Sequence, residues 1–78
     1  MVTVRYYAGA RAAAGVTEED VEVTTLAELR AEVERRHGGR LAAVLAVATF
    51  LSDGRPLVAD AAVPGGTIVE VLPPFAGG

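Results

Sequence analysis

Apolar and polar residues alternate from residue 2 to residue 7, the first patterned stretch of the chain. Val2, Val4 and Tyr6 fall on one side of the pattern, and the residues between them fall on the other. β-branched and aromatic residues at a period of two are typical of a half-buried strand. Residues 20–23 alternate in the same way, so we expect a hairpin of two strands with a helical turn in its alanine-rich connection.

A helical period begins at Thr25. Leu26, Leu29 and Val33 are three and four residues apart, which places them on one face of a helix. Thr25 and Glu28 have the spacing of a capping box, in which the two side chains satisfy backbone N–H groups of the first turn. A basic cluster and a Gly-Gly pair then predict the end of this helix.

A short helical turn over residues 40–46 leads from the helix into three further strands. The Asp53-Gly54 pair is a strong hairpin signal. Pro56 confines the returning strand to an edge of the sheet, because proline has no N–H to donate. A Pro-Gly-Gly turn precedes the last strand. The three strands are expected at residues 47–51, 57–59 and 67–72.

The order of these elements predicts the fold class. Two strands, one main helix and three strands are typical of an α+β layer. We therefore predict a mixed sheet of four to five strands with one main helix packed on one face.

Composition and charge narrow the function classes. The chain of 78 residues has a net charge of −3 and a pI of about 4.9, the wrong sign for binding the phosphate backbone of nucleic acids. It contains no cysteine, so no disulfide or thiolate metal site supports the fold. No apolar run reaches membrane-spanning length, and residues 1–5 do not resemble a signal peptide. We expect a cytoplasmic single-domain protein with no membrane or nucleic-acid partner.

No set of side chains in the sequence is arranged for catalysis. His37 is the only histidine and has no partners at metal-ligand spacing, so we interpret it as a positive charge at the helix end. Ser52 and Asp53 lie in a turn and have no identifiable base. The Gly-Gly pairs do not have the spacing of a phosphate loop. We therefore predict that the chain is not an enzyme and binds no metal ion and no cofactor.

The last six residues differ in character from the rest: Pro73, Pro74, Phe75, Ala76, Gly77 and Gly78. Prolines stop the preceding strand, and two glycines without Cβ atoms can enter a channel too narrow for any side chain. The terminal carboxylate is ionised at neutral pH. A frayed end is the alternative. We favour a folded domain over residues 1–72 that carries a flexible tail over residues 73–78, with the Gly78 carboxylate as the functional group.

The outward residues of the first and last strands form one surface if these strands are parallel neighbours: Thr3, Arg5 and Tyr7 beside Ile68, Glu70 and Leu72. In this arrangement we expect an ion pair between Arg5 and Glu70. Tyr7, Ile68 and Leu72 then form an exposed apolar patch that leads to the tail. Exposed patches of this kind mark partner sites. The alternative is that another strand or loop covers them.

The whole chain resembles one known family, and the resemblance rests on residues at both ends. It closes with Val71-Leu72-Pro73-Pro74-Phe75-Ala76-Gly77-Gly78, and it opens with Val4-Arg5-Tyr6-Tyr7-Ala8 followed by Arg11. These residues, with the order of the elements, resemble the MoaD/ThiS family of β-grasp, ubiquitin-like sulfur carriers, and most of all its molybdopterin synthase small subunits. Residues 60–72 also match, except that Thr67 stands where an acidic residue is usual.

The resemblance implies a function that agrees with the tail. A separate E1-like enzyme would use ATP to adenylate Gly78, and sulfur from a sulfurtransferase would replace AMP to leave a thiocarboxylate. The tail would then enter the large subunit of molybdopterin synthase and pass sulfur to a pterin precursor of the molybdenum cofactor. The implied reactive residues are Gly77 and Gly78, and the implied partner-binding residues are Tyr7, Arg11, Ile68, Leu72, Pro73, Pro74, Phe75 and Ala76.

Three alternatives stay open from the sequence. The same tail chemistry suits a sulfur carrier for another pathway, such as cysteine, thiamin, tRNA thiolation or a secondary metabolite. A ubiquitin-like protein modifier would instead join Gly78 to a lysine of a target protein. An interaction module with an inert terminus is the third possibility.

Overall fold

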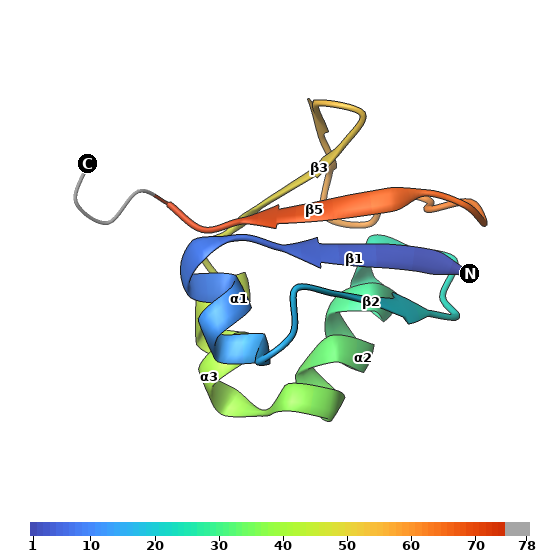
Figure 1. The fold of residues 1–78 in the computed structure, drawn as a ribbon. Helices are drawn as coiled ribbons and strands as arrows, with labels where there is room; N and C mark the ends of the chain where they lie inside the picture. The colour runs from blue at the N-terminus through green and yellow to red at the C-terminus, as the bar shows by residue number, and fades with distance from the viewer. Residues whose placement is uncertain (75–78) are drawn as a thin grey trace.

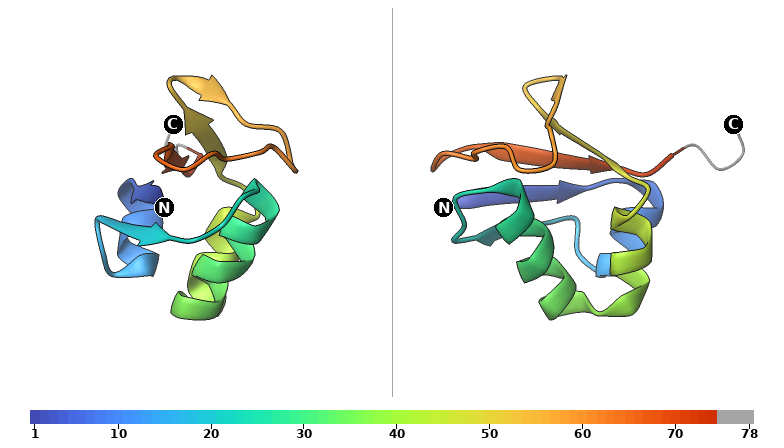
Figure 2. Two further views of the ribbon diagram at one scale, coloured as in Figure 1. Left: turned by 90° about the vertical axis from the view of Figure 1, so that its right-hand side faces the viewer. Right: turned by 180° about the vertical axis from the view of Figure 1, so that it is seen from behind.

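The fold is a single sheet covered on one face by helices. Its structure is a computed structural model that describes residues 1–74. The elements are β1 (Val2–Tyr6), α1 (Ala8–Ala14), β2 (Glu18–Val21), α2 (Leu26–His37), α3 (Gly39–Leu45), β3 (Thr49–Ser52), β4 (Arg55–Pro56) and β5 (Ile68–Leu72). The strands form a mixed sheet in the order β2-β1-β5-β3-β4. The helices lie below this sheet in Figure 1, and the β3–β4 hairpin rises on the other side (Figure 2).

The predicted α+β class and the mixed sheet are confirmed, but three helices replace the single main helix. α2 is the longest, with 12 residues, and α1 and α3 have seven each. α1 forms where only a helical turn was expected and ends at Gly15, whose φ of 78° lies in the left-handed region. All three helices therefore come from segments in which the sequence already indicated some helical structure.

The core lies between the sheet and the helices. The alternating side of β1 and the periodic stripe of α2 are buried, as predicted, because these two patterns face each other across the same interior. Burying each of these large apolar side chains stabilises the fold by roughly 1.5–3 kcal/mol. The buried residues in question are Val2, Val4, Tyr6, Leu26, Leu29 and Val33.

β1 and β5 lie side by side and run parallel, as expected. Thr3 is opposite Ile68 and Arg5 is opposite Glu70, so the outward residues of the two strands do align. Because parallel strands end at the same edge of a sheet, β5 ends beside the point where β1 passes into α1. The chain leaves the sheet at this edge, on the left of Figure 1.

The boundaries of β2 and β3 were predicted wrongly. β2 is Glu18–Val21 rather than residues 20–23, because its antiparallel pairing with β1 sets Val21 opposite Val2 and Glu18 opposite Arg5. β3 begins at Thr49, and Val47, which was predicted to open it, is 62% exposed beyond the end of α3. In both cases the pairing with a neighbouring strand overrode the local apolar pattern.

The β3–β4 hairpin is tighter than predicted. Asp53 and Gly54 have φ values of 52° and 76°, so they form a two-residue turn that pairs Ser52 directly with Arg55. The returning strand is therefore Arg55–Pro56, and residues 57–59, where it was expected, follow it. The prediction that proline lies in an edge strand is confirmed by the position of β4 in the sheet.

The start of α2 follows the capping prediction with one change. The Thr25 hydroxyl accepts a hydrogen bond from the Glu28 N–H at 3.1 Å, as predicted. The Glu28 carboxylate accepts from the backbone N–H of Thr24 at 2.7 Å and from its hydroxyl at 2.8 Å, one residue earlier than a capping box requires. Both bonds lower the pKa of Glu28, and the bond from the Thr24 N–H contributes more than the bond from its hydroxyl. Its charge is thus held beside the positive end of the helix.

Candidate functional site

The tail begins at the sheet edge where β1 passes into α1. The N–H of Tyr7 donates to the carbonyl of Val71 at 3.2 Å, and this bond joins the residue after β1 to the end of β5. Leu72 closes β5, and Pro73 and Pro74 follow as the last residues that the structure describes. Any function of the terminus must therefore start from this point of the surface.

An apolar groove lies beside the start of the tail. It encloses about 650 Å³, and none of the residues within 1–74 that line it carries a charge. One wall comes from the start of α1, the second from α3 and the residue beyond it, and the third from the tail. We call it the tail-root groove, and it is lined by Tyr7, Ala8, Gly9, Ala43, Val44, Val47, Leu72, Pro73 and Pro74.

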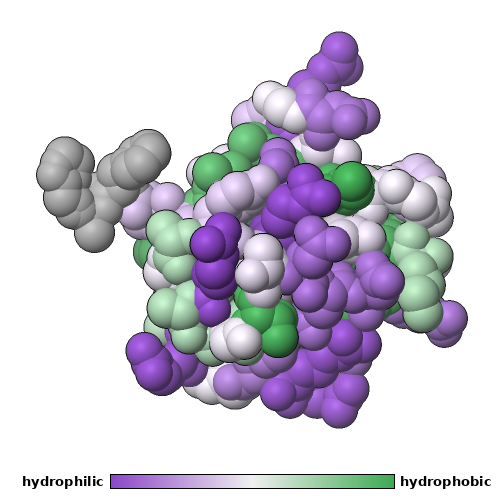
Figure 3. All heavy atoms as spheres, viewed as in Figure 1, coloured by the Kyte–Doolittle hydropathy of each residue, from purple (hydrophilic) through white to green (hydrophobic). Residues whose placement is uncertain are grey.

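The local structure explains why this groove is open. Ala8 has a φ of 48°, and this left-handed conformation turns the chain sharply from β1 into α1. Gly9 and Ala43 are small, so the walls from α1 and α3 stand close to the tail without filling the space between them. Apolar residues coloured green gather on this side, over α1, in Figure 3. The groove is thus an apolar hollow at the surface, of the kind that binds apolar side chains.

Tyr7 is held in the wall of the groove by Glu70. Its hydroxyl donates to the Glu70 carboxylate at 2.6 Å. This hydrogen bond, together with partial burial, raises the pKa of Tyr7. A short bond to a carboxylate fixes the ring more firmly than packing alone would.

The prediction of an ion pair between Arg5 and Glu70 was wrong. Arg5 instead pairs with Glu18 on β2, with Nε and Oε1 3.2 Å apart. Glu18 on β2 and Glu70 on β5 both lie directly opposite Arg5. The Tyr7 hydroxyl already donates to Glu70, so Arg5 pairs with Glu18. The sequence concealed this competition because β2 was expected two residues further along.

The structure brings together only part of the predicted partner-binding set. Tyr7, Leu72, Pro73 and Pro74 all line the tail-root groove. Ile68 does not, because it lies at the opposite end of β5, where it is 42% exposed. Arg11 does not line the groove either: its Nε donates to the Tyr6 carbonyl at 3.4 Å. The other predicted residues, Phe75, Ala76, Gly77 and Gly78, lie outside the described part of the chain.

The contribution of α3 to the groove was missed from the sequence. Ala43, Val44 and Val47 come from the region after α2 and meet the tail only in the folded chain. Val47 was expected to open a strand, and Val44 is partly buried against the core. An apolar residue beyond the end of a short helix was the available signal, but no sequence rule places it next to residue 74.

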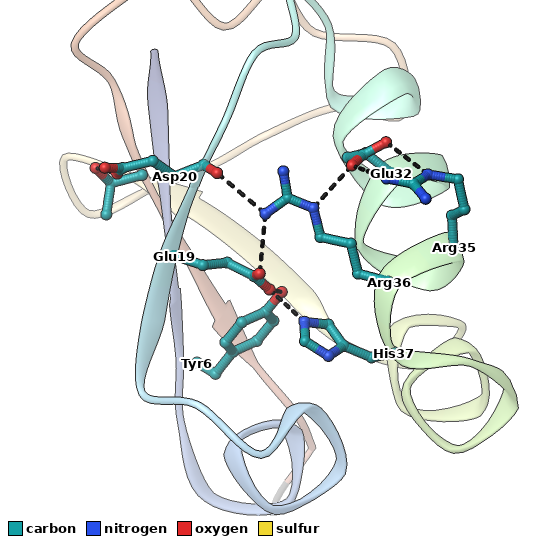
Figure 4. A network of polar contacts seen from close by, with 8 residues as sticks. Tyr6, Glu19, Asp20, Glu32, Arg35, Arg36 and His37 are labelled. Carbon is teal, nitrogen blue, oxygen red and sulfur yellow. Dashed lines mark hydrogen bonds and ion pairs between the residues drawn. The ribbon is translucent and has the colours of Figure 1, made fainter.

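A polar cluster joins β2 to the C-terminal end of α2 on another side of the molecule (Figure 4). The Glu19 carboxylate meets the Tyr6 hydroxyl at 2.6 Å, His37 Nε2 at 2.5 Å and Arg36 Nη1 at 3.0 Å. Burial alone would raise the pKa of Glu19, but the hydrogen bonds from Tyr6, His37 and Arg36 outweigh it and lower that pKa. We call Tyr6, Glu19, Arg36 and His37 the Glu19 cluster.

The Glu19 cluster supports a structural interpretation of His37. The side chain lies at the end of α2, as predicted, and contacts one carboxylate. Within residues 1–74, no three metal-binding side chains gather at one place. No helix in that range is long and apolar enough to span a bilayer.

Comparison with known proteins places the chain in a family. The model of the ThiS family matches residues 4–78, whereas no curated protein matches the sequence. A Pyrococcus furiosus structure assigned as molybdopterin converting factor subunit 1 is 28% identical, with a TM-score of 0.82 over 94% of this chain and 95% of that one. The Haloferax volcanii HVO 2177 protein is 25% identical, with a TM-score of 0.75 over 99% and 85%.

The same fold recurs in SAMP1 from Haloferax volcanii, which is 19% identical with a TM-score of 0.81 over 99% of this chain and 98% of that one. These likenesses confirm the predicted β-grasp fold. Proteins of the matching family are small sulfur carriers rather than catalysts. With nearly its whole length matched, from strand β1 to the terminal Gly-Gly, the chain belongs to the ThiS family of ubiquitin-like sulfur carriers.

Proposed function

We propose that the Gly78 carboxylate is the group that receives and donates sulfur, and that the chain is the small subunit of a molybdopterin synthase. The observation that carries the proposal is the tail-root groove, an uncharged apolar surface from which the tail itself starts. Family membership and the likeness to the Pyrococcus furiosus protein support the same function.

The chemistry of the terminus needs two activation steps. A carboxylate is a poor electrophile, so one of its oxygens first attacks the α-phosphorus of ATP on an E1-like enzyme, and pyrophosphate leaves. A sulfur nucleophile then attacks the acyl carbon of the adenylate, and AMP leaves. If the donor is a persulfide, a thiol reduces the resulting acyl disulfide and releases the thiocarboxylate. No side chain of this chain has to react, in agreement with the absence of cysteine.

The tail-root groove would hold the partner while the tail is inserted. A partner that receives Gly78 must pass over Pro73 and Pro74, which are part of the groove, so an apolar side chain of the partner can pack there. The prolines restrict the tail and so reduce the entropy lost on insertion. Six residues from Pro73 span at most about 20 Å, which is enough to reach a buried site.

Reconstitution tests both levels of the proposal. The chain is incubated with an E1-like activating enzyme, ATP and a sulfurtransferase, and its intact mass is measured. We expect an increase that corresponds to one oxygen replaced by sulfur. The large subunit of molybdopterin synthase and the pterin precursor are then added, and the thiocarboxylate should disappear as the dithiolene forms. A variant without Gly78 is the control.

The outcomes separate the proposed function from its alternatives. A thiocarboxylate that another sulfur-accepting enzyme consumes, but the large subunit does not, would retain the carrier chemistry and overturn the molybdopterin role. A terminus that never gains sulfur, together with Gly-Gly remnants on lysines of other proteins, would indicate a protein modifier instead.

A further inference from the structure

The negative charge of the chain is concentrated on one side of the molecule. Three arginines, Arg5, Arg35 and Arg36, pair with carboxylates there. The remaining four carboxylates and four arginines of the chain balance each other, so this side carries the whole net charge of −3. Hydrophilic residues, coloured purple, spread over β2 and α2 in Figure 3. The carboxylates on this side are Glu18, Glu19, Asp20, Glu22, Glu28 and Glu32.

β2 is an edge strand whose outer backbone groups point away from the sheet. The Thr17 carbonyl accepts from the Tyr6 N–H at 2.8 Å. The backbone N–H and C=O groups of residues 17, 19 and 21 therefore point toward β1, and those of Glu18 and Asp20 point away from the sheet. Outward N–H and C=O groups are a template for another strand. The edge therefore either needs protection or serves as a docking site.

Arg36 protects one of these outward groups. Its Nη1 donates to the Asp20 carbonyl at 3.1 Å, and the same guanidinium bonds to Glu19 and to Glu32. Figure 4 shows it bridging the gap between β2 and α2. Arg35 bonds to Glu32 but not to the β2 backbone. Arg36 thus covers the edge, and removing its bond to Asp20 would open a backbone acceptor.

A shallow groove continues from this edge between the end of β2 and α2. It encloses about 790 Å³ and combines apolar Val23 and Ala31 with the carboxylates of Glu22, Glu28 and Glu32 and with Arg35, which pairs with Glu32. It also reaches Met1, at the opposite end of β1 from the tail. The surface thus offers backbone acceptors, apolar contacts and negative charge in succession.

We propose that the β2 edge and this groove dock an extended, basic segment of a partner protein, which adds to β2 as a strand and displaces Arg36 from the Asp20 carbonyl. Basic side chains of the segment would pair with the carboxylates, and its apolar residues would pack on Val23 and Ala31. This site goes beyond the proposed sulfur chemistry, since it does not involve Gly78.

Charge also argues against the other occupants. In a second copy of the chain, an antiparallel β2–β2 pairing would set acidic residues opposite one another, which destabilises a sheet. Nucleic acids carry the same sign of charge as this surface. A basic peptide segment is complementary to it in both charge and backbone geometry.

NMR titration of the full chain tests the site. The probe is a blocked hexapeptide of alternating arginine and valine, and the control replaces each arginine by glutamate. We expect saturable amide shifts at residues 18–24 and 28–36, and binding at least about tenfold tighter for the basic peptide, weakened by salt. No saturable shift of these amides, or equal binding of both peptides, would overturn the proposal.

Charge reversal provides the first matched pair of variants. Glu22 is exposed and lines the groove, so Glu22→Lys should weaken peptide binding at least about fivefold. Asp60 is exposed on the loop after β4 and does not line the groove, so Asp60→Lys should change it less than about twofold. Equal effects of the two variants would show nonspecific attraction and contradict a defined site.

Two arginine variants test the displacement step. Arg35 lines the groove, so Arg36→Ala and Arg35→Ala both remove a positive charge at the site, but only the first frees the Asp20 carbonyl. We expect the peptide to bind Arg36→Ala more tightly than Arg35→Ala, with both titrations run well below the thermal midpoint of each variant so that both are folded. Equal affinities would overturn displacement of Arg36. Sulfur loading of Gly78 should be the same in all these variants, so the site and the proposed function fail independently.

Discussion

The tail-root groove and the β2–α2 side differ in almost every physical respect. The first is apolar and uncharged, and its residues come from α1, α3 and the start of the tail. The second carries the whole net charge, because its carboxylates outnumber its arginines. Ion pairs and hydrogen bonds there join a strand edge to a helix. One small fold thus separates a surface suited to apolar, salt-insensitive contacts from one suited to charged, salt-sensitive contacts.

Blocking the terminus should have the largest effect on function. A variant with one residue added after Gly78, shown by mass not to be trimmed, has no carboxylate at the diglycine and should form no thiocarboxylate. The β2–α2 side is unchanged, so binding of the basic peptide should be normal. Sulfur delivery at the normal rate by the blocked chain would contradict the proposed function.

A charge in the tail-root groove should be the next most damaging change. Val47→Asp places a carboxylate in the uncharged groove, where a bound partner would have to desolvate it, and should weaken partner binding about tenfold or more. Val47 is 62% exposed, so the fold should tolerate the change.

Val58→Asp is the matched control for this prediction. Val58 is 74% exposed and does not line the groove, so the same substitution there should leave partner binding within about twofold of normal. Calorimetry with the large synthase subunit measures both variants. Equal losses would show that the groove is not the docking surface.

Removing Glu19 should affect stability rather than sulfur transfer. Glu19→Ala leaves the Tyr6 hydroxyl and His37 without their carboxylate partner, and we expect it to lower the free energy of unfolding by about 1–3 kcal/mol. Glu19→Gln keeps an acceptor and should cost less. Urea unfolding measures the loss, and a loss of sulfur transfer at unchanged stability would contradict this division of roles.

The charged side should also make stability depend on pH. Hydrogen bonds from Arg35 and then Arg36 lower the pKa of Glu32 from 4.5 to about 2, and the pKa of Glu19 is lowered as well. The unfolded chain therefore binds more protons in this range, so the stabilisation is complete above about pH 4.5 and is lost as the pH falls toward about 2.

Urea midpoints measured from pH 2 to pH 7 check this dependence. The wild type should lose stability steadily as the pH falls below 4.5, and Glu32→Gln should show a shallower slope because it cannot titrate. Identical slopes for the two proteins would mean that Glu32 is not the group responsible.

Adjacent tyrosines provide the smallest and most direct comparison of the two regions. Tyr6→Phe removes a hydroxyl from the buried Glu19 cluster and should lower the free energy of unfolding by about 1 kcal/mol. Tyr7→Phe removes the same atom from the more exposed bond to Glu70 and should shift the thermal midpoint less. A larger shift for Tyr7→Phe would contradict the structural role assigned to the Glu19 cluster.

The sequence was sufficient wherever a local pattern decided the outcome. The alternation of β1, the periodic stripe of α2 and the Asp-Gly turn all formed as predicted, because side-chain period and turn geometry depend on neighbouring residues. The start of β2 and the partner of Arg5 were predicted wrongly, since both depend on which register of β1 and β2 packs best.

The sequence by itself therefore determined the α+β class, the buried stripes and the composition of the tail. Only the tertiary structure decided that Tyr7, Val47 and Leu72 share one groove and that Arg36 covers the edge of β2. The reason is physical: these residues are brought together by strand pairing and helix packing across the whole chain. Neither strand pairing nor helix packing can be predicted from the short-range pattern of apolar and polar residues.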